Sequence, residues 1–381
     1  MPVALIVGAG IGGLAAGIAL RRAGWDVRIV ERAATPREIG FGLGLAPNAI
    51  AALRELGVAD AVIARSVTPT VAEIRHVDGR VIRRFAGDLL GLPAGDRPSI
   101  ILRPTLHGVL LDALPPGAVE VNRAAVRFDA GGTPVRLELA DGTSATGDIL
   151  VGADGIGSAI RAQLHPAEPP ARPSGYFAVR GVSPAVNRLD GLQALWYFGH
   201  GLEAGVIQAS PNAIYWFLSL LADDVRAGPL DVGSVMRRLT TGFDRQFHAI
   251  AGATPAADLR LDELLVRAPL AQWGAGRVTL LGDAAHPMLP HTGQGAAQAL
   301  EDAVGLGRAV QAGGDPIAAL RRYEAVRSRR TRRVVAMGPR IARITTTKNP
   351  VVAVLRNSAI RFAPEMALKA FTQPGARDPT R

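Results

Sequence analysis

The stretch VALIVGAGIGGLAAGIALRRAGWDVRIVER, residues 3–32, decides the fold of the N-terminal part of the chain. A short apolar run at Val3–Val7 has the length and β-branched content of a buried strand, and a helical stretch follows to about Arg22. A second strand at Trp25–Val30 ends on Glu31. The order strand, glycine turn, helix and strand predicts one unit of a parallel α/β sheet.

The glycines of this turn have distinct expected tasks in a dinucleotide site. Gly8 makes the tight turn, Gly10 lets the backbone approach a pyrophosphate, and Gly13 lets the helix pack closely on the strand. The free N–H groups and positive dipole end of the helix face the phosphates. Glu31 lies where a carboxylate accepts hydrogen bonds from a ribose. The turn predicts a dinucleotide but leaves FAD and NAD open.

Length and composition set the class of protein. The chain has 381 residues, 48% hydrophobic and 20% charged, which is typical of a globular enzyme with two domains. Cysteine is absent, which excludes a disulfide framework and a cysteine nucleophile and agrees with a cytoplasmic protein. The uncharged residues 1–20 are interrupted by glycines and have no basic start, so we expect no integral membrane segment.

The net charge of +10 comes almost entirely from arginine, as in RRYEAVRSRRTRRVV, residues 321–335. This run is either an anion-binding patch or a solvated helix. A non-enzymatic nucleotide- or nucleic-acid-binding protein is therefore a distant alternative. Because no nucleic-acid-binding motif accompanies the charge, we expect no nucleic-acid partner.

Several patterns divide the middle of the chain. Residues 71–85 alternate around an Asp-Gly turn, which predicts a hairpin, and residues 99–114 predict a short strand leading into an amphipathic helix. Residues 117–151 predict a β-meander that closes on a strand, and residues 172–222 predict a separate antiparallel sheet rich in tyrosine and tryptophan. Such a sheet suits the wall of an apolar pocket or a plain aromatic core.

The segment GDAAHPMLPHTGQGAAQALEDA, residues 282–303, follows a buried strand and predicts a turn and a helix beginning near Gly293. Together with GAGIGG…ER (8–32), GADGIGSAIR (152–161) and the arginine of LRPTLHGVL, Arg103, it resembles the group A FAD-dependent monooxygenases, the family of para-hydroxybenzoate and salicylate hydroxylases. The resemblance spans residues 1–345.

The resemblance implies an α/β fold with a Rossmann-type, GR2-like FAD-binding domain, an inserted antiparallel β-sheet substrate domain and a C-terminal helical tail. The FAD-binding domain is expected to be discontinuous. The boundaries implied are 1–70, 99–168 and 272–345 for the FAD-binding domain, 71–98 and 169–271 for the substrate domain, and 346–381 for the tail.

The resemblance also implies the cofactor contacts. Glu31 binds the adenosine ribose, Arg103 lies along FAD, Asp283 holds a ribityl hydroxyl, and Pro290 with the Gly-Gln-Gly turn lies against the isoalloxazine ring. A helix end beside that ring stabilises the negative charge of reduced flavin. The cofactor-binding residues expected are Gly8, Gly10, Gly12, Gly13, Glu31, Arg32, Arg103, Val126, Asp154, Gly155, Gly282, Asp283, Pro290, Gly293, Gln294 and Gly295.

By resemblance, NADH or NADPH reduces FAD, O₂ adds to give a flavin C4a-hydroperoxide, and its oxygen reaches a small aromatic or heteroaromatic substrate. An epoxidase or a tailoring oxygenase of a polycyclic metabolite is the alternative outcome. The chain is expected to be a monomer or homodimer. His286 and His291 lie in a proline-containing loop with no third ligand at suitable spacing, so no metal is expected.

A phenolic substrate reacts better as phenolate, so a base or a positive neighbour near its hydroxyl helps. The catalytic candidates on the predicted sheet are Tyr215, Arg180 and His200. Arg180 is suited to a carboxylate or phenolate or to ordinary ion pairing. Tyr215 alternates with Trp216, so one of the two faces the ring, and His200 lies in a Gly-His-Gly sequence that predicts a hairpin turn.

Overall fold

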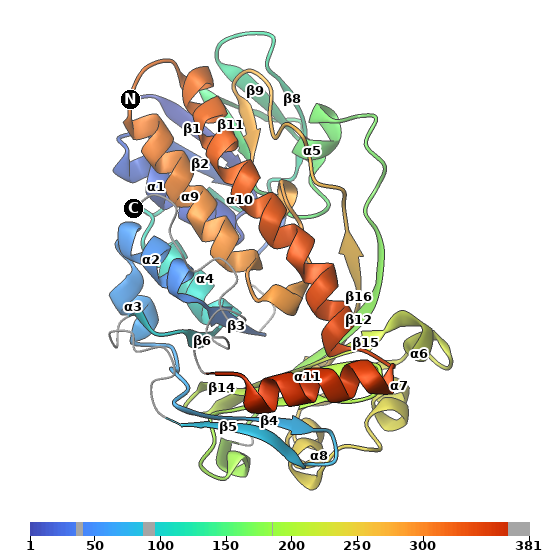
Figure 1. Ribbon diagram of the computed structural model, residues 1–381. Helices are drawn as coiled ribbons and strands as arrows, with labels where there is room; N and C mark the ends of the chain where they lie inside the picture. The colour runs from blue at the N-terminus through green and yellow to red at the C-terminus, as the bar shows by residue number, and fades with distance from the viewer. Residues whose placement is uncertain (36–40, 87–95, 185, 365–381) are drawn as a thin grey trace.

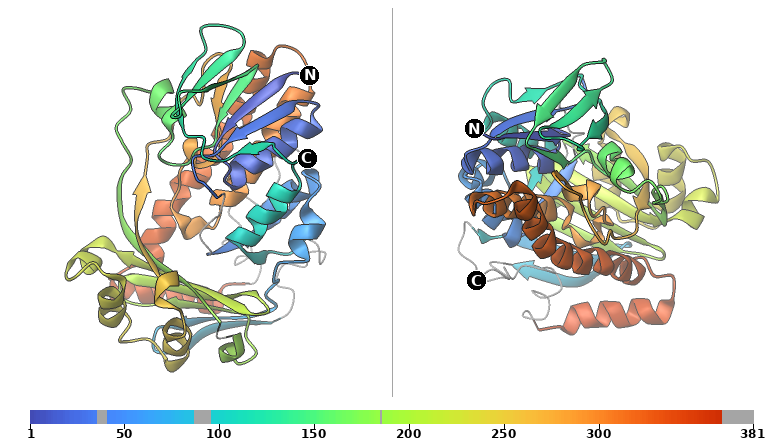
Figure 2. Two further views of the ribbon diagram at one scale, coloured as in Figure 1. Left: turned by 180° about the vertical axis from the view of Figure 1, so that it is seen from behind. Right: turned by 90° about the horizontal axis from the view of Figure 1, so that it is seen from above.

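The computed structural model describes residues 1–35, 41–86, 96–184 and 186–364. Figure 1 shows two lobes, an upper one around β1, β2 and β11 and a lower one around β4, β5 and β14. The long helix α10 (Pro316–Thr345) runs from the upper lobe to the lower. Seen from behind, the green and gold segments that lead into β12 and out of β16 connect the lobes along one side (Figure 2).

The upper lobe is built on a five-stranded parallel sheet of order β17-β11-β1-β2-β7. Its core is apolar on both faces, and the helices α1 (Ile11–Arg22) and α9 (Gly295–Gln311) pack against each other beside it. The predicted strand–helix–strand unit is confirmed. The strands are β1 (Val3–Val7), β2 (Asp26–Val30), β7 (Val119–Glu120), β11 (Ile149–Gly152) and β17 (Val278–Leu280).

Smaller elements complete this lobe and match the expected pattern of the middle of the chain. The predicted meander is a three-stranded antiparallel sheet, and its closing strand β11 belongs to the parallel sheet. The strand leading into a helix is confirmed as β6 and α4. These elements are β3 (Gly42–Leu45), β6 (Ser99–Leu102), β8 (Ala125–Asp129), β9 (Val135–Leu139), β10 (Ser144–Gly147), α2 (Pro47–Glu55), α3 (Ala59–Ile63), α4 (Arg103–Asp112) and α5 (Ala159–Leu164).

The lower lobe is a seven-stranded sheet of order β16-β12-β15-β14-β13-β4-β5. Neighbouring strands are antiparallel except β13 and β4, so the predicted antiparallel sheet is mixed at one pair. A parallel pair needs a long connection, and here the chain passes through the upper lobe between the two strands. The strands are β4 (Val71–His76), β5 (Val81–Ala86), β12 (Arg172–Ser183), β13 (Ala194–Phe198), β14 (Leu202–Ser210), β15 (Ala213–Leu221) and β16 (Arg260–Val266).

Alternation along β15 gives this sheet two different faces. Trp216 is fully buried against Phe247 of α8, and its indole donates a hydrogen bond to Thr254 at 2.8 Å. Tyr215 and Phe217 lie on the opposite face. The short helices of this lobe are η2 (Val186–Leu189), α6 (Ala222–Arg226), α7 (Val232–Leu239), α8 (Arg245–Gly252) and η3 (Ala256–Asp258).

The C-terminal part of the described chain is helical. The helix α11 (Pro350–Phe362) lies against β5, where Arg83 donates a hydrogen bond to the carbonyl of Ile360 at 3.0 Å. The remainder of the expected tail, residues 365–381, lies outside the described residues. Among the helices of the described ranges, none is long and apolar enough to cross a bilayer.

Candidate active site

A cavity of about 1070 Å³ lies between the parallel sheet and the open face of the seven-stranded sheet. The two sheets, the glycine turn after β1 and the loop after β17 all contribute to its walls. The structure brings every predicted cofactor residue to this cavity except Gly13 and Val126. Arg180 and Tyr215 line it as well, from the side of the seven-stranded sheet.

The glycine loop, Gly8–Gly13, is held by backbone contacts at short range. Gly8 has a φ of +102°, and its N–H donates to the carbonyl of Val30 at 2.8 Å. A Cβ on Gly13 would lie 1.9 Å from the carbonyl oxygen of Gly8, so only glycine allows α1 to start this close to the strand. Gly8 therefore has the turn geometry and Gly13 the packing task that the sequence predicts, and Gly13 supports the cavity without lining it.

Glu31 closes the glycine loop from the end of β2. Its carboxylate accepts hydrogen bonds from the backbone N–H of Ala9 at 2.8 Å and of Ala33 at 2.9 Å. Arg32 follows it on the cavity wall. A carboxylate at this position lies at the strand end beside the glycine turn, where the ribose of a dinucleotide is held.

A second part of the wall is the 282–295 loop, which joins β17 to α9. It contains two short 3₁₀ turns, η4 (Gly282–Ala284) and η5 (Pro290–Thr292), and Gly293 has a φ of +63°. The helix starts at Gly295, two residues after the predicted position, and the hydroxyl of Thr292 accepts a hydrogen bond from Gln294 N–H at 3.3 Å. A Cβ on Gly293 or Gly295 would meet nothing within 4 Å, so the loop borders open space.

Two carboxylates of the upper lobe line the cavity. Asp154 accepts a hydrogen bond from Ala159 N–H at 2.8 Å through Oδ2, and its buried Oδ1 has no partner among the described residues. Asp283 lies in the 282–295 loop with its side chain in the cavity. Burial raises the pKa of both carboxyl groups, and the charges of His286 and Arg103 act against that rise at Asp283.

These features fit FAD. The N-termini of α1 and α9 both border the cavity and offer free N–H groups to anionic groups. The glycines leave room for a close approach of the backbone, and the unpartnered oxygen of Asp154 lacks a hydrogen-bond donor that a ligand would supply. No part of the described chain gathers three or more His, Cys, Asp or Glu side chains in a group able to hold a metal ion.

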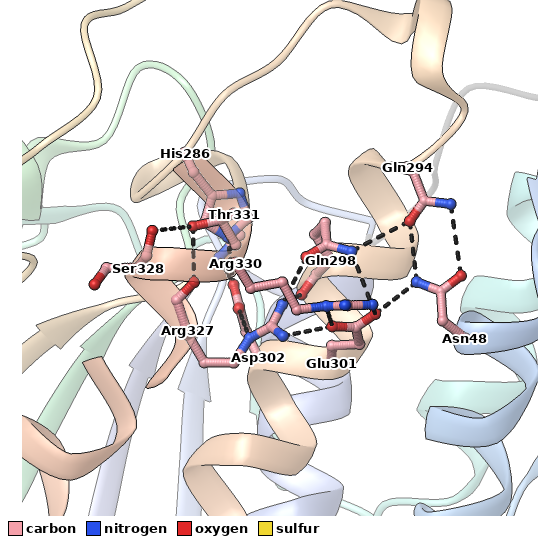
Figure 3. Close-up of polar contacts among 11 residues, drawn as sticks. Asn48, His286, Gln294, Gln298, Glu301, Asp302, Arg327, Ser328, Arg330 and Thr331 are labelled. Carbon is pink, nitrogen blue, oxygen red and sulfur yellow. Dashed lines mark hydrogen bonds and ion pairs between the residues drawn. The ribbon is translucent and has the colours of Figure 1, made fainter. Parts of the chain in front are cut away.

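A buried polar network supports the 282–295 loop from behind (Figure 3). Gln294 is 1% exposed, and its side-chain carbonyl accepts hydrogen bonds from Asn48 at 3.0 Å and from Gln298 at 3.2 Å. The Glu301 carboxylate accepts a hydrogen bond from the Asn48 side chain at 2.6 Å and forms an ion pair with Arg330 at 2.5 Å. The Gly-Gln-Gly turn is thus tied to α2, α9 and α10 through side chains that do not line the cavity, apart from Gln294 itself.

Asp302 is the centre of this network and is fully buried. Its Oδ2 accepts a hydrogen bond from Gly282 N–H at 3.0 Å and contacts His286 Nε2 at 2.5 Å, and its Oδ1 pairs with Arg327 Nε at 2.7 Å. Burial acts to raise the pKa of Asp302, but the charges of His286 and Arg327 hold that pKa below its usual range. Arg327 belongs to the arginine-rich run at 321–335. At this position the run is buried, so Arg327 belongs neither to a solvated helix face nor to an anion-binding surface patch.

Of the alternating pair, Tyr215 lines the cavity and Trp216 does not, and Arg180 lines it as well. The Tyr215 ring stacks on Phe217 with centroids 6.0 Å apart, and burial raises the pKa of its hydroxyl to about 12, against the charge of Arg180. Arg180 pairs with Asp262 at 2.5 Å and lies over the ring of Phe41 at 4.8 Å. Tyr215 is therefore neutral in the cavity, and Arg180 already has a carboxylate partner.

Besides Gly13, two predicted site residues do not line the cavity, His200 and Val126, and the structure contradicts their predicted place there. His200 is exposed at the turn between β13 and β14, which is the hairpin that its Gly-His-Gly sequence predicts. Val126 is 56% exposed on β8, while Arg123, Ala124 and Ala125 line the cavity. A register shift between Ala125 and Arg127 directs the Val126 side chain outward.

His291 lines the cavity, although the sequence suggests only a possible metal ligand at this position. Its Nε2 forms a hydrogen bond with the hydroxyl of Ser219 on β15 at 2.7 Å, and its ring meets Tyr176 edge-on at 5.2 Å. Burial lowers the pKa of His291 to about 4, so the ring is neutral. This contact joins the 282–295 loop to the seven-stranded sheet, a pairing that no sequence spacing indicates.

Comparison with known proteins also indicates an FAD-binding enzyme, over most of the chain. The model of a family described as FAD binding domain matches residues 1–337. Aurachin C monooxygenase/isomerase of Stigmatella aurantiaca is 36% identical over 372 residues, which is 97% of this chain and 96% of that protein. The 6-hydroxynicotinate 3-monooxygenase of Bordetella bronchiseptica is 32% identical, over 92% of this chain and 94% of that one.

Among solved structures, Klebsiella pneumoniae HpxO complexed with FAD and uric acid superposes with a TM-score of 0.89 at 28% identity. The match covers 97% of this chain and 95% of that one. Together with the glycine loop, the 282–295 loop and the cavity between them, these matches show that the chain belongs to the FAD-binding family of group A flavin-dependent aromatic monooxygenases.

Proposed function

We propose that this enzyme hydroxylates a small aromatic or heteroaromatic substrate between the 282–295 loop and the open face of the seven-stranded sheet. One observation carries the proposal: a single cavity is lined by the cofactor residues on one side and by aromatic side chains of the sheet on the other. Such a wall suits a flat, apolar ring. The names of the relatives include heteroaromatic and benzoate-type substrates, which supports this substrate class.

FAD, when bound, accepts electrons from NADH or NADPH and supplies the transfer of one oxygen atom from O₂ to the substrate. In this proposal the glycine loop and the N-terminus of α1 hold the pyrophosphate, and Glu31 and Asp283 accept hydrogen bonds from sugar hydroxyls. The N-terminus of α9 would offer partial positive charge to the negative charge that reduction adds to the flavin. The backbone of the 282–295 loop would contribute to holding the ring.

On the substrate side, the proposed tasks are orientation and the exclusion of water. Tyr215 keeps its proton and offers a hydrogen bond to an oxygen on the ring, since the pKa of its hydroxyl is raised to about 12. Arg180 is a positive neighbour to a phenolate, held in place by Asp262 and Phe41. The apolar surface around them lowers the local dielectric and strengthens both interactions.

The purified protein should be yellow and should oxidise NADH or NADPH faster when a substrate is present. A panel of phenols, aromatic acids, pyridines and quinolones is screened for this stimulation, with O₂ uptake and the mass of the product. A product that gains one oxygen atom supports the proposal, and NMR of that product separates a ring hydroxyl from an epoxide. Colourless protein that cannot be reconstituted with FAD contradicts it.

We also propose a cytoplasmic monomer or homodimer. The absence of cysteine supports a reducing compartment, and the cavity is lined by residues of one chain, so the site needs no second copy. Sedimentation velocity of the flavin-loaded protein checks the assembly, and a stable tetramer contradicts it.

A further inference from the structure

Glu203 is a buried carboxyl group on the substrate side of the cavity. It lies on β14, is 6% exposed and lines the cavity wall. Across the sheet it is directly opposite Ser219 on one side and Phe198 on the other. Residues opposite each other in neighbouring strands share a face, so Glu203 faces the cavity together with Ser219, which contacts His291 of the 282–295 loop. The carboxyl group is therefore one strand away from the wall expected to hold the flavin ring.

The surroundings of Glu203 are apolar and largely aromatic. The cavity residues nearest to it in the sheet are Phe198 and Trp196 of β13 and Phe217 of β15. Two helices of the C-terminal part of the chain close this end of the cavity, α10 through Ile341 and α11 through Ile360. A planar ring fits between such side chains, and Glu203 then supplies a polar group at the edge of that ring.

One oxygen of this buried carboxyl group lacks a partner. Its Oε2 has no hydrogen-bond partner among the described residues, and no ion pair of Glu203 occurs within the described ranges. Burial raises the pKa of Glu203, and the Thr345 hydroxyl, the Trp196 indole and the charge of Arg356 only partly offset the rise. An unmet buried acceptor is costly, and a ligand that brings a donor removes that cost.

Arg356, whose charge acts on Glu203, forms its hydrogen bonds with other groups. Arg356 of α11 donates hydrogen bonds to the carbonyls of Ile344 at 3.2 Å and of Thr345 at 2.8 Å, and it lies over the ring of Phe198 at 4.3 Å. It acts on Glu203 only through its charge. The missing partner of Glu203 is thus a hydrogen-bond donor on the ligand, an N–H or an O–H, whereas a carboxylate on the substrate brings only acceptors.

Resting on the proposed function, we infer that Glu203 is a substrate-recognition residue that accepts a hydrogen bond from a ring N–H of a heteroaromatic substrate. The inference names the class of substrate: planar nitrogen heterocycles that carry an N–H donor, in preference to aromatic carboxylic acids. Rotation about the last side-chain bond brings either oxygen to the donor, since that torsion is soft.

The test compares 4(1H)-quinolone, which has a ring N–H, with 1-methyl-4-quinolone, which has none. Binding of each to the flavin-loaded enzyme is followed by the change in flavin absorbance, which needs no turnover. We expect wild type to bind the N–H compound about tenfold to a hundredfold more tightly. Glu203→Leu should bind both compounds alike, while Glu203→Gln, which keeps an acceptor, should keep most of the preference.

Glu263→Leu is the matched control, because Glu263 belongs to the same sheet but pairs with Arg226 and does not line the cavity. It should keep the full preference. Flavin content is measured for every variant, so a loss of fold or of FAD is separated from a loss of recognition.

Equal binding of the two quinolones to wild type, or an unchanged preference in Glu203→Leu, overturns the inference. A loss of both compounds in Glu203→Leu with full flavin content also overturns it, since Glu203 would then support the shape of the pocket. Hydroxylation of an aromatic acid by an enzyme that ignores both quinolones refutes the inference and leaves the proposed function standing. Protein that never binds FAD refutes the proposed function instead.

Discussion

The glycine loop and the 282–295 loop line the same cavity, but different interactions hold them in place. The glycine loop depends on close backbone contact, as between the carbonyl of Gly8 and the position where Gly13 would carry a Cβ. The 282–295 loop depends on buried charges, with Asp302 bound to Gly282, His286 and Arg327. The first loop is held mainly by backbone contacts, with hydrogen bonds from Ala9 to Glu31 and from His107 to Ala9, and the second by side chains from three helices.

This difference determines how each loop responds to substitution. Backbone packing tolerates no added atom, whereas a buried ion pair is sensitive to the loss of either partner. Substitutions in the glycine loop should therefore act by steric conflict, and substitutions behind the 282–295 loop should act by leaving a buried charge unpaired. The following predictions test that contrast, beginning with the largest expected effect.

Gly13→Ala should abolish flavin binding. The added methyl group would lie 1.9 Å from the Gly8 carbonyl oxygen. Because that oxygen belongs to the backbone, it cannot rotate away as a flexible side chain would. Severe overpacking typically costs roughly 3 kcal/mol, and we expect the free energy of unfolding to fall by at least that much. Flavin content and thermal unfolding measure the effect, and Gly108→Ala is the control, because a Cβ there meets nothing within 4 Å. A yellow, stable Gly13→Ala protein would refute the backbone account of this loop.

Arg327→Met should destabilise the protein by about 3–5 kcal/mol, because it leaves Asp302 charged, buried and short of a partner. Flavin affinity should fall with stability, since Gly282 is held by the same carboxylate. Urea unfolding and flavin titration measure both. Arg308→Met, which breaks an exposed pair with Glu55, should cost at most about 1 kcal/mol. Equal effects of the two substitutions would remove the distinction between the loops.

Asp283→Ala should weaken FAD binding about tenfold to a hundredfold, as the loss of a hydrogen bond to a carboxylate does. Asp283 lines the cavity and, among the described residues, forms no hydrogen bond with the buried network, so its removal should not destabilise the flavin-free protein. Flavin dissociation constants from fluorescence titration measure the effect, with Asp283→Asn as the conservative variant. Unchanged affinity in Asp283→Ala would exclude Asp283 from flavin binding.

His291 should make the 282–295 loop sensitive to mild acid. Its pKa is lowered from 6.5 to about 4 by burial, so between these values the unfolded state binds a proton that the folded state does not. The stability contributed by the neutral ring is complete above pH 6.5 and is lost as the pH falls toward 4.

Between pH 7.5 and pH 5.5 this loss amounts to about 1 kcal/mol. His291→Gln should lose that much less stability than wild type over the same interval, measured by urea unfolding at both pH values. Identical pH profiles would mean that His291 titrates normally in the folded protein.

The residues that could be predicted are those whose task depends on near neighbours in the sequence. The turn at Gly8, the close packing at Gly13 and the outward turn at His200 follow from local patterns, although His200 was also considered a catalytic candidate. Val126, which the resemblance places among the cofactor-binding residues, does not line the cavity, and its strand has a register shift at this point. Periodicity alone does not detect such a shift.

Glu203 and Arg327 could not be predicted, because each depends on partners far away along the chain. Glu203 reads as one polar residue in a strand, and only its place opposite Ser219 shows that it faces the cavity. Arg327 reads as one member of an arginine-rich helix, and only packing against α9 shows that it neutralises Asp302.

The sequence by itself determined the family, the cofactor and the order of the main elements. Glycine turns, strand length and helix starts are set by local backbone sterics and hydrogen bonding, which a short motif contains in full. Only the tertiary structure decided which side chains meet in the cavity and which charges lie buried behind it. Burial and ion pairing depend on contacts between distant segments, and their free energies exist only once those segments are packed together.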